Sequence, residues 1–214
     1  MKHVVPDAQQ LRKQLDKLIS QTSLSVTDEQ RIQLVQLVLM LVKWNKAYNL
    51  TSVRDPQQML IRHIMDSILI APYVTGQHIA DVGTGPGLPG LPLAIMHPTK
   101  HFVLIDSLGK RMNFIRQFIH QVGLTNVTVV QSRVETYQPE KAFDCVLSRA
   151  FASLADMLTW CHHLPSDQGH FVALKGQLDP AELQLIPAGY QVNATHRIEV
   201  PQLEAERHVV IITK

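Results

Sequence analysis

A glycine-rich stretch at residues 79–90, IADVGTGPGLPG, restricts the fold of this chain more than any other feature. A short apolar run ends in Asp81, glycines follow at 83, 85 and 87, and a helical pattern comes next. This order predicts a strand, a tight loop and a helix. Glycines in such a loop permit positive φ and let a ligand lie against the backbone, and the helix N-terminus adds unpaired N–H groups. The stretch therefore indicates a nucleotide-type site in an α/β sheet.

Two overlapping motifs within this stretch imply different ligands. Residues 85–90, GPGLPG, fit the G-x-G-x-x-G fingerprint of dinucleotide-binding proteins, whereas residues 81–87 fit the D-x-G-x-G-x-G motif of S-adenosylmethionine-dependent methyltransferases. Prolines at 86, 89 and 92 each remove an amide donor that a pyrophosphate would use. Residues 81–99 contain no Lys or Arg, and Asp81 supplies a negative charge that suits the amino group of a methionine moiety. The loop therefore favours S-adenosylmethionine over NAD, and a turn that only connects strand and helix is the remaining interpretation.

Beyond this stretch the chain alternates between strand-like and helical patterns. Strands are predicted at 79–82, 101–105, 127–131, 143–148 and 170–174, and helices at 88–97, 109–122, 153–162 and 179–186. Such alternation predicts a parallel, doubly wound sheet. Residues 190–200 and 207–213 are strand-like with no helix between them, so we expect a terminal hairpin whose last strand runs antiparallel to the rest.

The first 75 residues carry helical periodicity instead and form a predicted N-terminal cap. Helices are predicted over 7–20, from a capping box at Thr27 and Gln30 to a break at Trp44-Asn45, and from Pro56 to residue 69. On the third of these helices a polar face of Arg62, His63 and Asp66 interrupts an otherwise apolar pattern.

Composition narrows the class of protein further. A hydrophobic content of 45% with 18% charged residues is typical of a globular protein with a substantial core. The net charge is only +2, so contact with nucleic acid must come from a local patch. Cys145 and Cys161 form neither a disulfide framework nor a zinc cluster, so no metal is expected. No signal peptide and no apolar run of membrane-spanning length is found, which predicts no membrane contact and a cytoplasmic location.

Polar residues at the predicted strand ends are the candidate site residues, because ligands of open α/β sheets bind beyond the carboxyl ends of the strands. Asp106 follows the second strand, where it could accept hydrogen bonds from both ribose hydroxyls of an adenosine; capping the helix at 109–122 is the alternative. Arg133, Val134 and Glu135 follow the third strand, where an adenine edge would lie.

Positively charged side chains stand at the carboxyl ends of the fourth and fifth predicted strands. Arg149 and Lys175 at a cleft mouth suit a phosphate-bearing substrate, and Arg207 with His208 adds a basic pair at the entry to the last strand. Ordinary surface exposure is the alternative for each of them. The exit of the fourth strand lacks the N-P-P-Y or D-P-P-Y motif expected for amide or amine methylation and the Pro-Cys pair of cytosine-C5 chemistry.

With these residues in place, the chain resembles the bacterial small-subunit ribosomal RNA guanine-N(7) methyltransferases, the family once called glucose-inhibited division protein B. The matching stretches are KWNKAYNLTSVRDP (43–56), RHIMDS (62–67), DVGTGPGLPGLPLAI (81–95), LIDSLGKRMNFIRQ (104–117), QSRVE (131–135), SRAFASLADMLTWC (148–161), ALKGQ (173–177) and ERHVV (206–210). They follow one another in order over most of the chain.

The resemblance implies a class I S-adenosylmethionine-dependent methyltransferase fold over residues 76–214, Rossmann-like, with a seven-stranded sheet and an antiparallel last strand, preceded by the helical cap at 1–75. It implies methyl transfer from S-adenosylmethionine to N7 of one guanine, guanine 527, of 16S rRNA. The substrate would be the rRNA itself, a precursor particle or the small ribosomal subunit. The predicted cofactor contacts are Asp81, Gly83, Gly85, Leu88, Asp106, Val134, Glu135 and Arg149, and the predicted RNA contacts are Arg133, Lys175, Arg207 and His208.

The implied chemistry requires no general base, because guanine N7 already carries an in-plane lone pair. Catalysis would rest on positioning and electrostatics, supplied by Arg149 and Lys175, so no catalytic acid or base is predicted. Two other classes stay open at this point: an NAD-dependent oxidoreductase that uses residues 85–90 and Asp106, and a non-catalytic RNA- or ribosome-binding module.

Overall fold

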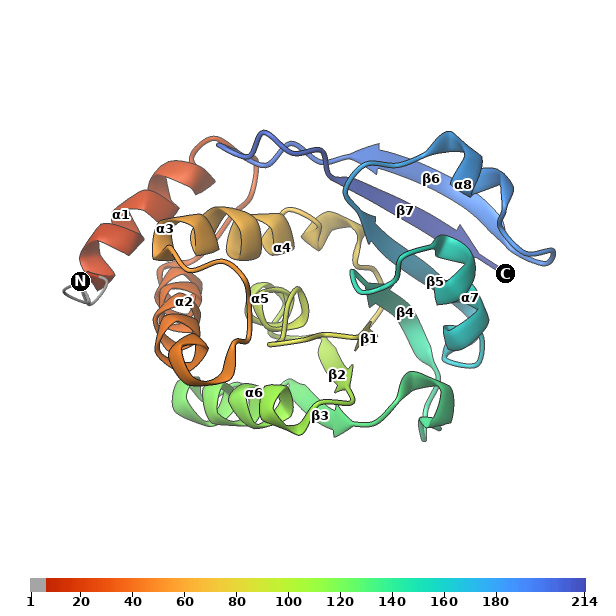
Figure 1. Cartoon of the computed structure of the whole chain (residues 1–214), viewed down its shortest axis with the longest axis horizontal. Coiled ribbons are helices and arrows are strands. Elements are labelled where there is room, and N and C mark those ends of the chain that lie inside the picture. Colours follow the sequence, from red (N-terminus) through yellow and green to blue (C-terminus); the bar gives the residue numbers. More distant parts are fainter. Residues whose placement is uncertain (1–6) are drawn as a thin grey trace.

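The computed structural model describes residues 7–214 (Figure 1). Its centre is a seven-stranded sheet in the order β3-β2-β1-β4-β5-β7-β6. The strands are β1 His78–Val82, β2 His101–Asp106, β3 Val127–Gln131, β4 Phe143–Ser148, β5 Pro165–Lys175, β6 Gln191–Arg197 and β7 His208–Thr213. Strands β1 to β5 pair in parallel, and β7 is antiparallel to both β5 and β6. The predicted parallel sheet with an antiparallel last strand is therefore confirmed.

The two faces of the sheet bury separate sets of apolar side chains. On one face Leu104 and Leu147 pack with residues of helices α5 Gly90–Met96 and α6 Gly109–Val122. On the other face Val103 and Val146 pack with residues of helix α7 Leu154–Cys161. Because both faces are covered, the central strands are apolar along nearly their whole length, as in other parallel sheets. Figure 1 shows α5 and α6 on one side of the sheet and α7 on the other.

The N-terminal helices lie on the same face as α5 and α6. They are α1 Ala8–Ile19, α2 Asp28–Tyr48, α3 Pro56–Met59, the π-helix η1 Leu60–Met65, α4 Asp66–Ile68 and the 3-10 turn η2 Ala71–Tyr73. Their buried side chains belong to one continuous apolar cluster with those of α5 and α6. The helical cap thus shares a core with the sheet, and a domain boundary at residues 75/76 stays a prediction.

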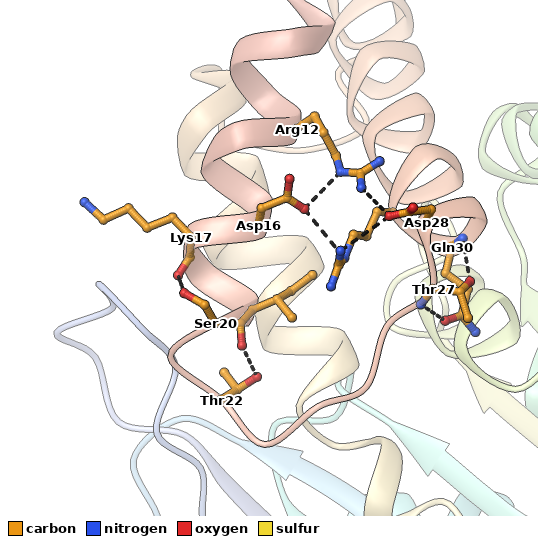
Figure 2. A network of polar contacts seen from close by, with 10 residues as sticks. Arg12, Asp16, Lys17, Ser20, Thr22, Thr27, Asp28 and Gln30 are labelled. Atoms are coloured by element: carbon orange, nitrogen blue, oxygen red, sulfur yellow. Dashed lines mark hydrogen bonds and ion pairs between the residues drawn. The ribbon is translucent and has the colours of Figure 1, made fainter.

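Polar contacts fix the start of α2 (Figure 2). The predicted capping box is present, since Thr27 Oγ1 accepts the backbone N–H of Gln30 and Gln30 Oε1 accepts the backbone N–H of Thr27. Asp28 accepts a hydrogen bond from Arg12 of α1, which ties the two helices together, and another from Arg31 of its own helix.

Three local details differ from the sequence-based prediction. Helix α2 does not break at Trp44-Asn45 but runs to Tyr48. The loop beyond the helix satisfies the Asn45 side chain, because its Nδ2 donates to the Val53 carbonyl and its Oδ1 accepts the Thr51 backbone N–H. The helix from Pro56 contains the π-helical segment η1, which no sequence signal indicated. Strand β5 begins at Pro165, ahead of the predicted start at His170. Within residues 7–214 every helix is too short or too polar to cross a lipid bilayer.

Candidate functional site

The loop after β1 owes its shape to its glycines. The backbone φ angle is +66° at Gly83, +61° at Gly85 and +86° at Gly87, a region that residues with a Cβ rarely adopt. A Cβ at Gly83 would lie 2.5 Å from the Cβ of Ala150, whereas one at Gly85 would meet no atom within 4 Å. The loop is therefore packed closely at its first glycine and open at its second.

Asp81 of β1 holds this loop in place through hydrogen bonds. Its side chain is completely buried, and Oδ2 accepts hydrogen bonds from the Thr84 hydroxyl at 2.6 Å and the Gly90 amide at 2.8 Å. Oδ1 has no protein partner within residues 7–214. Burial raises the pKa of Asp81 to about 7, against the two hydrogen bonds, which lower it. Loop support is a role that sequence reasoning missed; the predicted contact of Asp81 with the methionine amino group stays a prediction.

Asp106 connects the end of β2 to the same loop. Its Oδ2 accepts the Gly85 amide N–H at 3.0 Å and an Arg111 guanidinium N–H at 3.1 Å, and Oδ1 accepts the Leu108 amide N–H at 2.9 Å. The carboxylate therefore orders the turn before α6 but does not cap the helix, whose N-cap residue is Leu108 and whose first N–H groups donate to no side chain within residues 7–214. Asp106 also lines a cavity. Its bonds within the protein therefore do not exclude the predicted contact with a ribose, which stays a prediction.

That cavity, which we call the glycine-loop cavity, has a volume of about 430 Å³. It is lined by Val82, Gly83, Ile105, Asp106, Ser107, Leu108, Arg111, Ser132, Arg133, Val134, Glu135, Ala150, Phe151 and Trp160. Its volume lies in the range of about 300–1,000 Å³ typical of small-molecule sites. Four predicted cofactor residues meet here: Gly83, Asp106, Val134 and Glu135. Arg133, predicted to contact RNA, lines this cavity as well.

The other predicted cofactor residues do not line the glycine-loop cavity. Asp81 and Leu88 are buried within the loop structure, Gly85 contributes its amide to Asp106, and Arg149 lines a second cavity. Sequence reasoning also missed two apolar side chains at the rim, Leu108 and Trp160, which are 44% and 46% exposed. Their exposure, which only the fold reveals, was not readable from the helical pattern.

The second cavity, which we call the arginine cavity, has a volume of about 420 Å³ and shares Phe151 with the first. Its lining residues are Val53, Arg62, His63, Asp66, Ile70, Arg149, Phe151, Leu174, Lys175, Gly176, Ile198, Arg207 and His208. The structure thus brings together Arg149 and three of the four predicted RNA contacts, and adds the polar face of the third N-terminal helix.

One buried carboxylate links two of these cations. Asp66 is 4% exposed; its Oδ1 lies 2.8 Å from Arg207 Nε and its Oδ2 3.3 Å from Arg149 Nη1. The three residues come from α4, from the segment after β4 and from the segment before β7. No sequence signal indicated this pairing, because the partners lie far apart along the chain.

Lys175 is an anchored cation. Its Nζ donates to the Ala152 carbonyl at 2.7 Å and to Glu182 Oε1 at 2.9 Å, and its side chain is 13% exposed. Glu182 Oε1 also accepts the Leu154 amide N–H. Lys175 therefore holds the segment that leads into α7, in addition to lining the arginine cavity.

His63 presents a neutral imidazole in the arginine cavity. It is 8% exposed, and its Nε2 lies 2.8 Å from Thr51 Oγ1. Burial, with a further contribution from the positive charge of Arg149, lowers the pKa of His63 to about 4. His63 is thus uncharged near neutral pH.

Neither cavity has the features of a metal centre. Within residues 7–214 no group of three or more His, Cys, Asp or Glu side chains could hold a metal ion. Cys145 and Cys161 are both buried and reduced, and burial raises the pKa of the Cys161 thiol to about 12.

The fold and the site together define a class. The strand order with an antiparallel β7 and a glycine-loop cavity at the carboxyl ends of β1 to β4 is that of class I S-adenosylmethionine-dependent methyltransferases. Solved structures share this fold. A SAM-dependent methyltransferase from Aquifex aeolicus aligns with a TM-score of 0.58 at 17% identity, covering 78% of this chain and 97% of that chain. TrmN from Thermus thermophilus aligns with a TM-score of 0.55 at 21% identity, covering 70% and 48%.

Sequence comparison identifies the family within this class. Residues 30–210 match the rRNA small subunit methyltransferase G family, and the chain belongs to it. The ribosomal RNA small subunit methyltransferase G of Aeromonas salmonicida is 63% identical over 196 residues, which cover 92% of this chain and 94% of that protein. Its counterpart in Psychromonas ingrahamii is 62% identical over 204 residues, covering 95% and 99%.

Membership of this family confirms the predicted activity at the level of class. The chain is an rRNA methyltransferase, and its cofactor is S-adenosylmethionine. The resemblance seen in the sequence is confirmed over most of the chain.

Proposed function

We propose that this protein transfers the methyl group of S-adenosylmethionine to N7 of guanine 527 in 16S rRNA, either in the rRNA, in a precursor particle or in the small ribosomal subunit. The observation that carries the proposal is the pair of cavities that meet at Phe151. One offers the residues of a nucleoside-type cofactor site and the other a group of cations. The cytoplasm, where ribosomal subunits are assembled, is the proposed location.

The glycine-loop cavity fits the cofactor by its donors and acceptors. Asp106 Oδ1 accepts one hydrogen bond within the protein, and a carboxylate oxygen can accept two, so it retains an acceptor site for a ribose hydroxyl. Val134 and Glu135 follow β3, where they can contact the adenine edge. When bound, S-adenosylmethionine supplies an electrophilic methyl group on a positively charged sulfur.

The arginine cavity fits an RNA segment by its charge. Arg62, Arg149 and Arg207 outnumber the single lining carboxylate, Asp66, and Lys175 is paired with Glu182. A cavity with this excess of cations suits phosphate groups, which arginine binds through several N–H donors at once.

The protein's own residues supply orientation rather than proton transfer. Guanine N7 attacks with its in-plane lone pair, and no proton leaves the atom that becomes methylated. The titratable groups agree with this requirement: His63 is neutral and bonded to Thr51, and Asp66 is bonded to two arginines. Catalysis would therefore come from holding the guanine in line with the methyl group in a site of low water content.

Methyl transfer with mapping of the product tests the proposal. Unmodified 16S rRNA and small subunits, both from a strain without the modification, are incubated with the protein and methyl-labelled S-adenosylmethionine. We expect label at one guanine, and chain cleavage specific for N7-methylguanine should locate it at position 527. Label on another atom or another base, or none with either substrate, would contradict the proposal.

Ligand-induced stabilisation separates this function from the two alternative classes. S-adenosylmethionine and its demethylated product should raise the melting temperature, because ligand at 100 times its Kd adds about 2.7 kcal/mol of stability. A dinucleotide-dependent oxidoreductase would be stabilised by NAD instead. A non-catalytic binding module would retain rRNA without incorporating label.

A further inference from the structure

Asp66 holds two arginines that approach from different parts of the fold. Arg149 follows β4 and Arg207 precedes β7, and each bonds a different oxygen of the same carboxylate. The Asp66 side chain is 5% exposed, whereas those of Arg149 and Arg207 are 32% and 25% exposed. The carboxylate is therefore buried, and the cations that it holds are accessible from the arginine cavity.

Both arginines keep most of their hydrogen-bonding capacity. A guanidinium has five N–H donors. Arg149 uses Nη1 on Asp66, and Arg207 uses Nε on Asp66 and Nη1 on the Glu206 carbonyl. The other N–H groups of both side chains have no acceptor within the described residues 7–214, so they are free to bind a ligand.

A rigid helical segment carries Asp66. Asp66 follows the last residue of the π-helix η1, and its backbone N–H donates to the carbonyl of Ile61 within that helix. The next side chain, Ser67, is buried and bonded to the His63 carbonyl. A group that must place two long side chains works best from such a rigid element.

We propose that Asp66 is a positioning residue, which sets Arg149 and Arg207 at a fixed spacing so that their free N–H groups grip the phosphates of the substrate RNA. The inference rests on the proposed function, because it takes the arginine cavity as the RNA site. It also gives the N-terminal helical cap a part in the reaction: the cap supplies the carboxylate that orders cations from the methyltransferase fold.

The positioning role and simple electrostatics predict opposite changes in RNA affinity when the negative charge of Asp66 is removed. If only net charge mattered, removal of a negative charge from a cavity with excess cations would strengthen RNA binding. If Asp66 positions the arginines, its removal releases both side chains and weakens RNA binding. The direction of the change therefore separates the two possibilities.

The experiment compares Asp66→Asn with the parent protein in steady-state methylation of the rRNA or subunit that the parent methylates. Asparagine keeps the size and one acceptor oxygen, but its amide N–H₂ cannot accept from an arginine. We expect the KM for RNA to rise about ten-fold or more with a smaller change in kcat. The Kd for S-adenosylhomocysteine should stay within about two-fold, because Asp66 does not line the glycine-loop cavity. Loss of an ordered phosphate contact should also lower the salt slope of RNA binding by about 0.7–0.9.

Asp28→Asn is the matched control. Asp28 also bonds two arginines, Arg12 at 2.7 Å and Arg31 at 3.5 Å, but lines neither cavity. Figure 2 shows this network between α1 and α2. Because the charge change is the same, the control should leave the KM for RNA and the salt slope near the parent values. Asp66→Glu restores the charge and should recover part of the RNA affinity.

The failures of the two proposals are distinguishable. If the parent methylates no rRNA, the proposed function fails. If the parent is active but Asp66→Asn binds RNA as well as or better than the parent, or loses cofactor and RNA affinity equally, the positioning role is wrong. Should Asp66→Asn not fold, Arg207→Lys decides: it keeps the charge but not the planar fork, so an unchanged KM for RNA would overturn the proposal.

Discussion

The carboxylate of Asp106 accepts a hydrogen bond from the backbone amide of Gly85 at 3.0 Å. This contact joins the end of β2 to the tip of the glycine loop, so one side chain both shapes the loop and lines the cavity beside it. Loss of Asp106 therefore changes the loop as well as the ligand contact, and a test of its role has to separate the two.

Asp106→Ala should weaken S-adenosylmethionine binding roughly 10- to 100-fold, because it removes charge-assisted hydrogen bonds of about 1.5–3 kcal/mol. Asp106→Asn keeps an acceptor for the Gly85 amide, so its loss should lie near the lower end of this range. Calorimetric titration of both folded variants measures the effect. Unchanged affinity in Asp106→Ala would mean that the carboxylate only orders the turn before α6.

Trp160 should report on cofactor binding. It is 46% exposed at the rim of the glycine-loop cavity, where its ring lies edge-on to Phe151 with centroids 5.6 Å apart. A bound ligand should cover part of the indole and change its fluorescence. Trp44, the other tryptophan, packs against Phe114 away from this cavity. Trp160→Phe should therefore abolish the change on titration with S-adenosylhomocysteine; a change that persists in this variant would assign the signal to Trp44.

The sheet was predictable because its signals are local. Apolar runs alternate with helical patterns, and the glycines and Asp81 mark the first turn. Where the predicted bounds of an element were wrong, a partner outside that element decides the outcome: Asn45 stays helical because Thr51 and Val53, in the loop beyond the helix, satisfy its side-chain amide. Strand β5 starts early because Phe143 pairs with Pro165 across a register shift, in a segment whose polar residues indicate a loop.

The strand-end residues of the site were predictable, since the order of parallel strands places their carboxyl ends at one edge. Their partners were not. Asp66 reaches Arg149 across 83 residues and Arg207 across 141, and Lys175 pairs with Glu182 of α8 Pro180–Gln184. Such pairs depend on how helices pack on the sheet, which periodicity does not specify.

Lys175→Ala should weaken RNA binding and reduce its log–log salt slope by about 0.7–0.9, if the ammonium group contacts one phosphate. Glu182→Gln is the matched control, because it breaks the same ion pair but keeps the ammonium group. The control should retain the parent salt slope. Equal effects of the two variants on RNA binding would instead show that the ion pair acts only by holding the segment before α7.

His63 should make the folded protein sensitive to acid. Its pKa is about 4 in the folded protein and about 6.5 in an unfolded chain. Between these values the unfolded chain binds a proton that the folded protein does not, so the free energy of unfolding falls as the pH falls. The contribution is fully present above about pH 6.5. At about pH 5 it should be smaller by about 2 kcal/mol.

His63→Gln tests this sign, since glutamine can bond Thr51 but does not titrate. Urea denaturation at about pH 7.5 and pH 5 gives the acid-induced loss of unfolding free energy for each protein. We expect the loss to be about 2 kcal/mol smaller in the variant. Asp81 acts in the opposite direction, because its raised pKa favours the folded state at low pH; this contribution is common to both proteins and cancels in the difference. An equal loss in parent and variant would mean that His63 takes up its proton in the folded protein at the ordinary pKa.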